Sequence, residues 1–231
     1  MAEFEIRTLA YGKLLEKVHL APGETSVTVP DGITRLGSLA FKGLTALEEV
    51  ILPDSVEEFE THFYDCPALK RIRFSENLPG IAGTAFLRCT ALEEIRLPAN
   101  AREIGTEAFK DCTGLREVVL GEHTERICFR VFQGCTALQR VVFFAEIDYI
   151  KPDAFQGCTA LCDLDFAVPP RPGSMLHLQI TQIFQNDAKL AARILDAGNM
   201  TRPLAEIAQN AARSCGRSNQ AARLEEFLRR S

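Results

Sequence analysis

The sequence predicts a repeat solenoid with short parallel β-strands on one side and irregular or short helical segments on the convex side, followed by a small C-terminal α-helical cap. Three observations predict this fold. A phenylalanine recurs at 23-residue steps through Phe86, Phe109, Phe132 and Phe155, and a cysteine keeps the same period. After residue 174 the apolar spacing becomes helical. A unit of this length cannot bury its apolar side alone, so neighbouring units are expected to stack.

Residues 1–23 are predicted to form an N-terminal cap. The segment "FEIRTLAYGKLLEKVHL" at 4–20 alternates like a strand at both ends, and we expect it to pair onto the first repeat. It lacks the basic start and apolar core of a signal peptide, and no run approaches the ~18 apolar residues of a membrane span. These features predict a cytoplasmic protein without membrane insertion, with a secreted or cell-surface location as the alternative if an export signal is missing.

The solenoid is predicted over residues 24–167. A partial unit opens it, and one irregular step of 22 residues separates Phe41 from Phe63, with a residue missing between Phe59 and Phe63. In "LEEIRL" the apolar residues alternate with Arg96, as in a half-buried strand. The clearest units read "AFLRCTALEEIRLP" at 85–98, "AFKDCTGLREVVLG" at 108–121, "VFQGCTALQRVVFF" at 131–144 and "AFQGCTALCDLDFA" at 154–167.

The unit "IGTEAFKDCTGLREVVL" at 104–120 resembles the BspA-type leucine-rich repeat, whose pattern is Ile-Gly…Ala-Phe…Cys…Leu…Ile-x-(Ile/Leu)-Pro. The resemblance covers roughly residues 24–167. It implies a right-handed leucine-rich-repeat solenoid with a role in binding, and it supplies no catalytic residue. Many members of that family are bacterial surface proteins that attach to host or matrix proteins.

Residues 168–174 are predicted to be a proline-rich linker and residues 175–231 a helical module of three or four short amphipathic helices. Gly198 and Gly216 are the expected helix stops, and Thr201 and Ser218 are the expected N-caps. From residue 174 onward the net charge is +3, and the rest of the chain carries −8. The module either engages an acidic partner or is a solvated capping bundle. We favour the bundle because a charged helix face is usually just exposed.

Five of the eight cysteines share one repeat position, which Leu44 occupies in the first full repeat: Cys66, Cys89, Cys112, Cys135 and Cys158. A position that accepts leucine is apolar, so we expect buried free thiols. Thiols in a line along a solenoid neither converge on a metal nor all pair as disulfides. Cys162 instead falls on a polar position of the repeat, and the C-terminal helices are its expected cover.

No motif for chemistry was found. His19, His62, His123 and His177 lie outside any catalytic or zinc pattern and are expected at the surface. The net charge of −5 gives no basic field for nucleic acid. We therefore predict no enzyme, no cofactor, no metal and no nucleic-acid partner.

The predicted binding site is the concave strand face, for a protein or peptide partner. Val119, Val142 and Phe144 are expected to form an exposed apolar strip on it. A regulatory or enzymatic role at the solenoid–helix junction is the alternative, and it requires a pocket near residues 165–185. The sequence specifies neither the partner nor the oligomeric state. The candidate residues are Glu49, Ile51, Arg71, Arg73, Glu94, Arg96, Glu117, Val119, Arg140, Val142, Phe144, Asp163 and Asp165.

Overall fold

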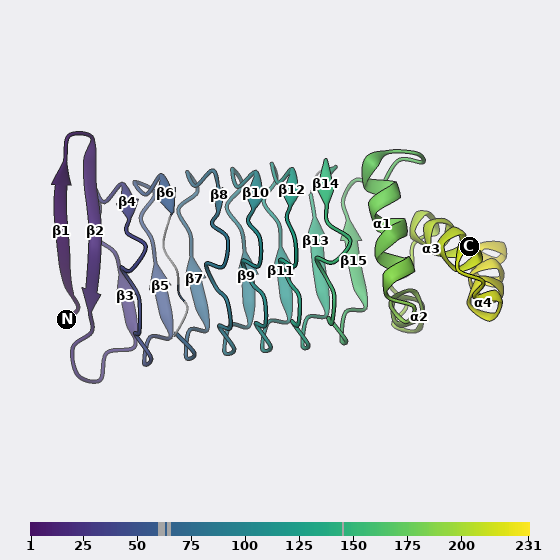
Figure 1. The fold of residues 1–231 in the computed structure, drawn as a ribbon, viewed down its shortest axis with the longest axis horizontal. Coiled ribbons are helices and arrows are strands. Elements are labelled where there is room, and N and C mark those ends of the chain that lie inside the picture. The colour runs from purple at the N-terminus through teal and green to yellow at the C-terminus, as the bar shows by residue number, and fades with distance from the viewer. Residues whose placement is uncertain (60–62, 64–65, 145) are drawn as a thin grey trace.

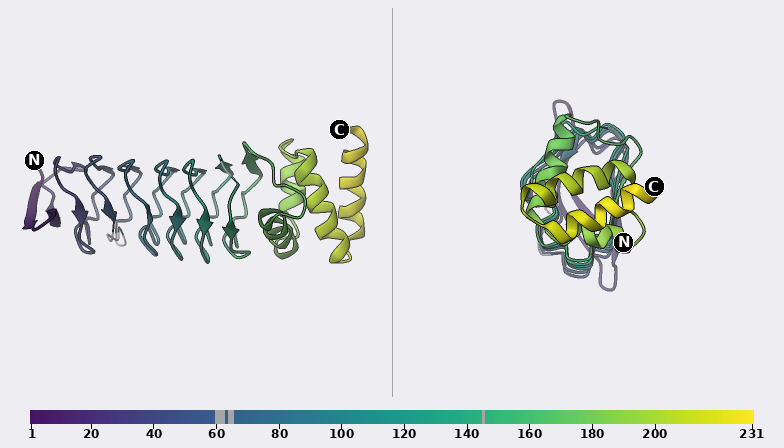
Figure 2. Two further views of the ribbon diagram at one scale, coloured as in Figure 1. Left: turned by 90° about the horizontal axis from the view of Figure 1, so that it is seen from above. Right: turned by 90° about the vertical axis from the view of Figure 1, so that its right-hand side faces the viewer.

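The computed structural model describes residues 1–59, 63, 66–144 and 146–231. Over these residues the chain forms fifteen strands followed by four helices. Figure 1 shows a rod with a β-hairpin at the N-terminal end, a row of stacked coils and a group of helices at the C-terminal end. The row is nearly straight in the views of Figures 1 and 2, so the face predicted as concave is here called the strand face.

The N-terminal hairpin consists of β1 (Glu3–Leu9) and β2 (Gly12–His19), paired antiparallel. β2 then pairs in parallel with β4 (Arg35–Leu36) of the first coil. The buried Leu15 and Val18 of β2 join the core of the solenoid. The hairpin therefore extends one sheet of the solenoid beyond its first coil.

The strand face carries one short strand from each coil, and all of these strands run parallel. They form two sheets, with strand orders β3-β5-β7 and β9-β11-β13-β15. The strands are β3 (Ser26–Thr28), β5 (Glu49–Ile51), β7 (Arg71–Arg73), β9 (Glu94–Arg96), β11 (Glu117–Val119), β13 (Arg140–Phe143) and β15 (Asp163–Phe166).

The opposite side carries two-residue strands and turns. The sequence predicts irregular or short helical segments there, and the irregular form is the one observed. The sheets of this side have the orders β1-β2-β4-β6 and β8-β10-β12-β14. Both faces are interrupted next to the repeat with the 22-residue step, and the position of its missing residue falls outside the described residues. The further strands are β6 (Glu58–Phe59), β8 (Gly80–Ile81), β10 (Glu103–Ile104), β12 (Arg126–Ile127) and β14 (Tyr149–Ile150).

A column of phenylalanine rings forms the centre of the core between the two sides. One ring comes from each coil, and neighbouring rings stack with centroids 4.7 to 5.6 Å apart. Stacked and buried rings contribute both apolar area and ring–ring attraction. The 23-residue period is therefore the repeat of the core, which confirms the predicted solenoid. The rings belong to Phe41, Phe63, Phe86, Phe109, Phe132 and Phe155.

Four helices close the C-terminal end: α1 (Met175–Asn186), α2 (Leu190–Asp196), α3 (Arg202–Ser214) and α4 (Ser218–Arg230). Their presence confirms the predicted helical part of the fold, and the end view of Figure 2 shows them lying across the end of the coils. Within the described residues, no helix is long and apolar enough to cross a membrane.

The helix boundaries agree with the expected stops but not with both expected caps. Gly198 and Gly216 follow helices with φ of +77° and +68°, where glycine is favoured. Thr201 occupies the N-cap position of α3, but its side chain makes no capping hydrogen bond. The prediction for Ser218 is wrong, since Arg217 holds the N-cap position and Ser218 is the first helical residue of α4. The side chain of Arg217 donates to the carbonyl oxygens of Phe184 at 2.9 Å and Gln185 at 2.6 Å, near the end of α1.

Candidate protein-binding face

The candidate residues alternate with buried ones along each strand of the strand face. An inward-pointing residue is buried in six of the seven strands: Val27, Val50, Ile95, Val118, Val141 and Leu164. The flanking candidates therefore point outward, because neighbouring residues of a strand face opposite sides. Parallel pairing places equivalent candidates side by side on neighbouring strands, as it does for Glu117 and Arg140.

Arg140 is the centre of an acidic cluster at the C-terminal end of this face. Its guanidinium lies 3.4 Å from Glu117, 3.1 Å from Asp163 and 2.5 Å from Asp165. The hydrogen bond to Asp165 and the nearby carboxylates raise the pKa of Arg140. Burial raises the pKa of the Asp163 carboxyl, against the attraction of Arg140. These four candidate residues therefore form one ion-pair network centred on Arg140.

Near the N-terminal end, two arginines of β7 are each held by an acid. Arg71 Nε lies 3.3 Å from Glu49, and Arg73 lies 3.6 Å from Asp54. Arg73 also donates to the carbonyl oxygen of Leu52 at 3.2 Å. Both guanidinium groups are more than half exposed, so these ion pairs contribute little to stability and can be exchanged for a partner's groups.

β9 lies between these two groups and differs from both. Glu94 and Arg96 are exposed, and in the described part of the chain neither side chain has a hydrogen bond or ion pair. The middle of the strand face thus presents one acid and one base that the fold leaves unused.

The predicted apolar strip is only partly present. Val119 is 8% exposed, which corrects its assignment to the strip. Arg96 and Val142 flank it in register on the two neighbouring strands. Phe144 is 42% exposed, while Val142 and Ile51 are half-buried. The accessible apolar surface is therefore centred on Phe144.

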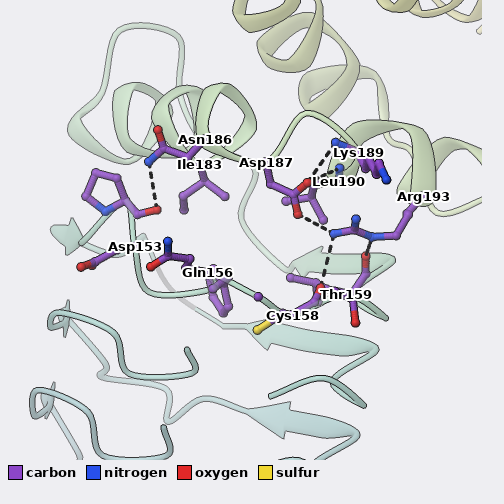
Figure 3. A pocket seen from close by; sticks show the side chains of 14 residues that line it. Asp153, Gln156, Cys158, Thr159, Ile183, Asn186, Asp187, Lys189, Leu190 and Arg193 are labelled. Atoms are coloured by element: carbon purple, nitrogen blue, oxygen red, sulfur yellow. Dashed lines mark hydrogen bonds and ion pairs between the residues drawn. The ribbon is translucent and has the colours of Figure 1, made fainter. Parts of the chain in front are cut away.

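A cavity of about 580 Å³ lies between the last coil and helices α1 and α2 (Figure 3). Residues 152–161 and 183–193 contribute its lining. The alternative role requires a pocket near residues 165–185, and this cavity enters that range only at Ile183. A smaller pocket of about 250 Å³ lies within that range, lined by Pro169, Pro170, Arg171, Pro172 and His177 together with Pro203 and Glu206.

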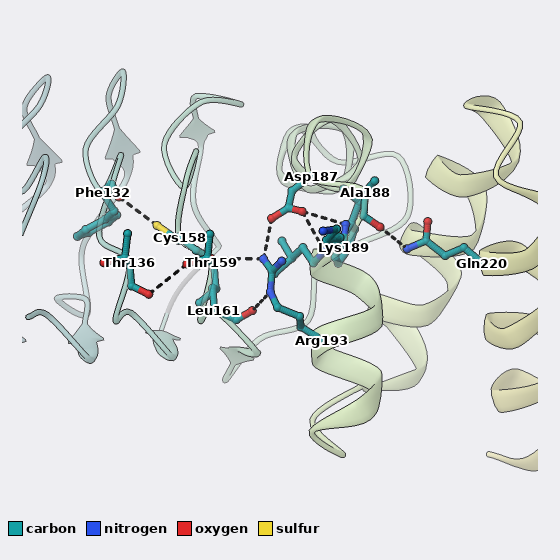
Figure 4. A network of polar contacts seen from close by, with 12 residues as sticks. Phe132, Thr136, Cys158, Thr159, Leu161, Asp187, Ala188, Lys189, Arg193 and Gln220 are labelled. Atoms are coloured by element: carbon teal, nitrogen blue, oxygen red, sulfur yellow. Dashed lines mark hydrogen bonds and ion pairs between the residues drawn. The ribbon is translucent and has the colours of Figure 1, made fainter. Parts of the chain in front are cut away.

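The polar groups of this cavity form a network that joins the helices to the solenoid (Figure 4). Arg193 donates to the carbonyl oxygens of Leu161 at 2.8 Å and Cys158 at 3.3 Å, and it pairs with Asp187 at 2.6 Å. Asp187 also accepts the backbone N–H of Leu190 at 3.1 Å. These contacts attach the C-terminal helices to the last coil. The polar groups of the cavity therefore have a structural role.

The repeated cysteines form a chain of buried thiols. Each thiol donates to the carbonyl oxygen of the phenylalanine one repeat earlier, for example Cys112 to Phe86 at 3.0 Å. Burial raises the pKa of the Cys112 thiol, and it raises that of Cys158 to about 12. Within the described residues the cysteines form no disulfide, and there is no cluster suited to a metal ion. Cys162 is half-buried, and Asn199 beyond α2 donates to its carbonyl oxygen at 3.1 Å.

Of the four histidines, His19 and His123 are exposed and His177 is half-buried, while His62 lies outside the described residues. His19 lies 2.5 Å from Glu5 on the N-terminal hairpin.

One exposed group on the opposite face was not predicted. The ammonium of Lys151 lies 4.2 Å from the ring centres of both Phe129 and Tyr149. Phe129 is 47% exposed. The available signal was its repeat position, where the other coils have Ser38, Gly83, Thr106 and Pro152.

The fold is similar to solved bacterial leucine-rich repeat structures. The leucine rich repeat protein of T. pallidum is 27% identical, with a TM-score of 0.64 over 70% of this chain and 78% of that chain. A leucine rich cell surface protein from Faecalibacterium prausnitzii is 23% identical, with a TM-score of 0.54 over 71% and 38%. The pneumococcal vaccine antigen PcpA is 19% identical, with a TM-score of 0.57 over 63% and 36%. The last two likenesses show the fold alone.

No curated protein matches the chain. Residues 23–139 match six copies of the BspA type leucine-rich repeat region, which is more than half of the chain. The coils, the phenylalanine column and this match agree, and the chain belongs to the BspA-type leucine-rich repeat family.

Proposed function

We propose that this protein binds a protein or peptide partner on its strand face and acts as a non-enzymatic scaffold. The observation that carries the proposal is the unused pair on β9, Glu94 and Arg96, at the middle of that face. Charged groups without an internal partner favour a partner with complementary charge. Phe144 supplies an exposed aromatic ring on the same face, of the kind that anchors interfaces. The family is typically one of cell-surface or binding proteins, which supports the same function.

The test is affinity purification from the native cell with the full chain as bait, followed by quantitative mass spectrometry. Reversing charge in the double variant Arg73→Glu and Arg96→Glu is expected to lower partner recovery at least tenfold, because like charges oppose at the contact. The melting temperature is expected to stay within about 2 °C, since exposed charges contribute little to stability.

The matched control replaces Arg35 on β4 and Arg126 on β12 together by Glu, which gives the same total charge change on the opposite side of the solenoid. It should leave partner recovery unchanged. Equal recovery with the double variant and the control would show that the strand face is not the binding surface.

A second proposal places the same binding activity on a cell surface, as in an adhesin. The supporting observation is the shared fold with the Faecalibacterium prausnitzii protein, which is described as a cell surface protein. Protease treatment of intact cells separates the two locations. Rapid loss of the protein from intact cells supports a surface role, and protection until lysis supports an internal one.

A further inference from the structure

The C-terminal end of the solenoid is covered by side chains that bind its outward backbone groups. Gln179 of α1 is 6% exposed and accepts the N–H of Ile150 of β14 at 2.5 Å. Arg193 of α2 donates to the carbonyl oxygen of Leu161, and Asn186 donates to that of Pro152 at 3.4 Å. The helices therefore take the hydrogen-bonding groups that the last coil would otherwise leave free.

The N-terminal end is different, because β1 is the outermost strand of its sheet and pairs with β2 only. Leu9 and Gly12 close the hairpin, so the backbone groups of Leu9 face β2. Hydrogen-bonding direction alternates along a strand, and the extra residue of the bulge, Glu16, lies on β2. The backbone N–H and C=O groups of Phe4, Ile6 and Thr8 therefore point away from β2. An open edge of this kind is a template for another strand.

The sequence of β1 is complementary to itself in one antiparallel register. With two copies arranged about Ile6, Glu5 of each copy lies opposite Arg7 of the other. Ile6 then occupies a hydrogen-bonded pair, in agreement with its outward backbone groups. Glu5 and Arg7 occupy a non-hydrogen-bonded pair, where Cα atoms are about 4.5 Å apart and side chains are closest. Centring the pairing on Glu5 or on Arg7 instead would place like charges together.

Ile6 also supplies an apolar contact at this position. Its side chain is 43% exposed although it lies opposite the fully buried Leu15 of β2. In the proposed arrangement the Ile6 side chains of the two copies meet beside the half-buried Phe4 residues. The solenoid core of one copy would then continue into that of the other.

We propose that β1 pairs antiparallel with β1 of a second copy of this chain, centred on Ile6, to form a head-to-head dimer. The sheet that contains β6, β4, β2 and β1 continues across the dyad into the second copy. This interface is separate from the strand face and does not depend on the function proposed above. A pairing of this size is small, so we expect a dissociation constant on the order of micromolar.

The first test measures the mass of the full chain by analytical ultracentrifugation over a range from about 1 to 500 µM, chosen to bracket that constant. Arg7→Glu or Glu5→Arg alone sets like charges opposite each other at both symmetry-related pairs. Each is expected to raise the dimer dissociation constant about tenfold or more. The double variant restores opposite charges, and an equimolar mixture of the two single variants does so between chains. Both should recover dimer, while Arg102→Glu on a coil should change nothing.

The second test uses a disulfide at the dyad in a Cys215→Ser background, which removes the exposed native thiol. In a hydrogen-bonded antiparallel pair the Cα atoms are about 5.5 Å apart, within reach of a disulfide. Ile6→Cys should therefore give a covalent dimer on mild oxidation. Thr8→Cys is the matched control, because its two copies would lie about 14 Å apart.

Circular dichroism of each variant checks that the fold is retained. A chain that stays monomeric over the whole concentration range overturns the proposal. The open edge of β1 would then be available only to a strand of a different protein. Failure of the double variant and of the mixture to recover dimer, or equal cross-linking through Thr8→Cys, also overturns the proposed pairing.

Discussion

Val119 and Arg140 occupy outward positions on neighbouring strands, yet their surroundings differ from what those positions predict. Val119 lies in register between Arg96 and Val142 of the neighbouring strands and is nearly buried. Arg140 gathers three carboxylates. The buried cysteines, by contrast, behave as their repeat position predicts, because a thiol next to a carbonyl in an apolar column acts as a small apolar residue with a weak donor.

The thiols give a prediction at this scale. At pH 8 a thiol reagent such as DTNB should label Cys215 within minutes, because it is exposed, and Cys128 and Cys162 more slowly, because they are half-buried. The five thiols of the ladder should react only after denaturation. All five are buried, and burial raises the pKa of four of them, Cys89, Cys112, Cys135 and Cys158. These four stay protonated at a pH where an exposed thiol begins to ionise, and the thiolate is the reactive form. Spectrophotometric counting before and after adding guanidinium measures this. Labelling of all eight in the native state would contradict it.

The strands and helices are held by different kinds of contact. Within each sheet, a strand of one coil pairs with the equivalent strand of the next coil, so one repeat pattern specifies these pairings. The helices pack apolar residues against the core of the solenoid and also bind the last coil through individual polar side chains, among which Arg193 donates two hydrogen bonds to it. The start of α1 also depends on one side chain, because Ser174 caps the helix by accepting the N–H of His177 at 3.2 Å.

Replacing Arg193 tests the junction. Arg193→Met keeps much of the side-chain volume but removes the guanidinium that donates to two carbonyl oxygens and pairs with Asp187. We expect a loss of about 1–3 kcal/mol in the free energy of unfolding, as is typical when partly buried polar groups lose a charged partner. Chemical denaturation measures the change. The control is Arg202→Met, whose exposed pair with Glu206 should contribute less than about 1 kcal/mol. Equal effects of the two variants would show that Arg193 does not join the helices to the coils.

At the scale of the whole molecule, a solenoid is stabilised by contacts between neighbouring coils and has two unlike ends. Phe86, Phe109 and Phe132 have a stacked ring on each side, whereas Phe41 has one only on its C-terminal side among the rings of the column. The C-terminal end is sealed by helices, and the N-terminal end finishes in an open strand edge. Local stability should therefore vary along the rod.

Hydrogen exchange with mass spectrometry measures that variation. In a sample dilute enough to remain monomeric, amides of β11 and β13 should exchange most slowly, because these strands pair with a neighbour on both sides. Amides of β1 should exchange fastest among the strands, since half of them face solvent at the open edge. Protection of β1 equal to that of β11 under these conditions would contradict this account.

The sequence alone determines the period, the columns of the core and the solenoid fold, because every coil repeats the same apolar positions and local pattern suffices to align them. It also identifies which strand residues point outward. The tertiary structure decides how those residues are used: that Arg140 gathers acids, that Val119 is covered, and that Glu94 and Arg96 stay unpaired. It also decides where the junction cavity lies and how Gln179 and Arg193 seal one end. These outcomes depend on contacts between side chains whose reach and orientation no repeat pattern specifies, and on helices that dock from outside the repeat.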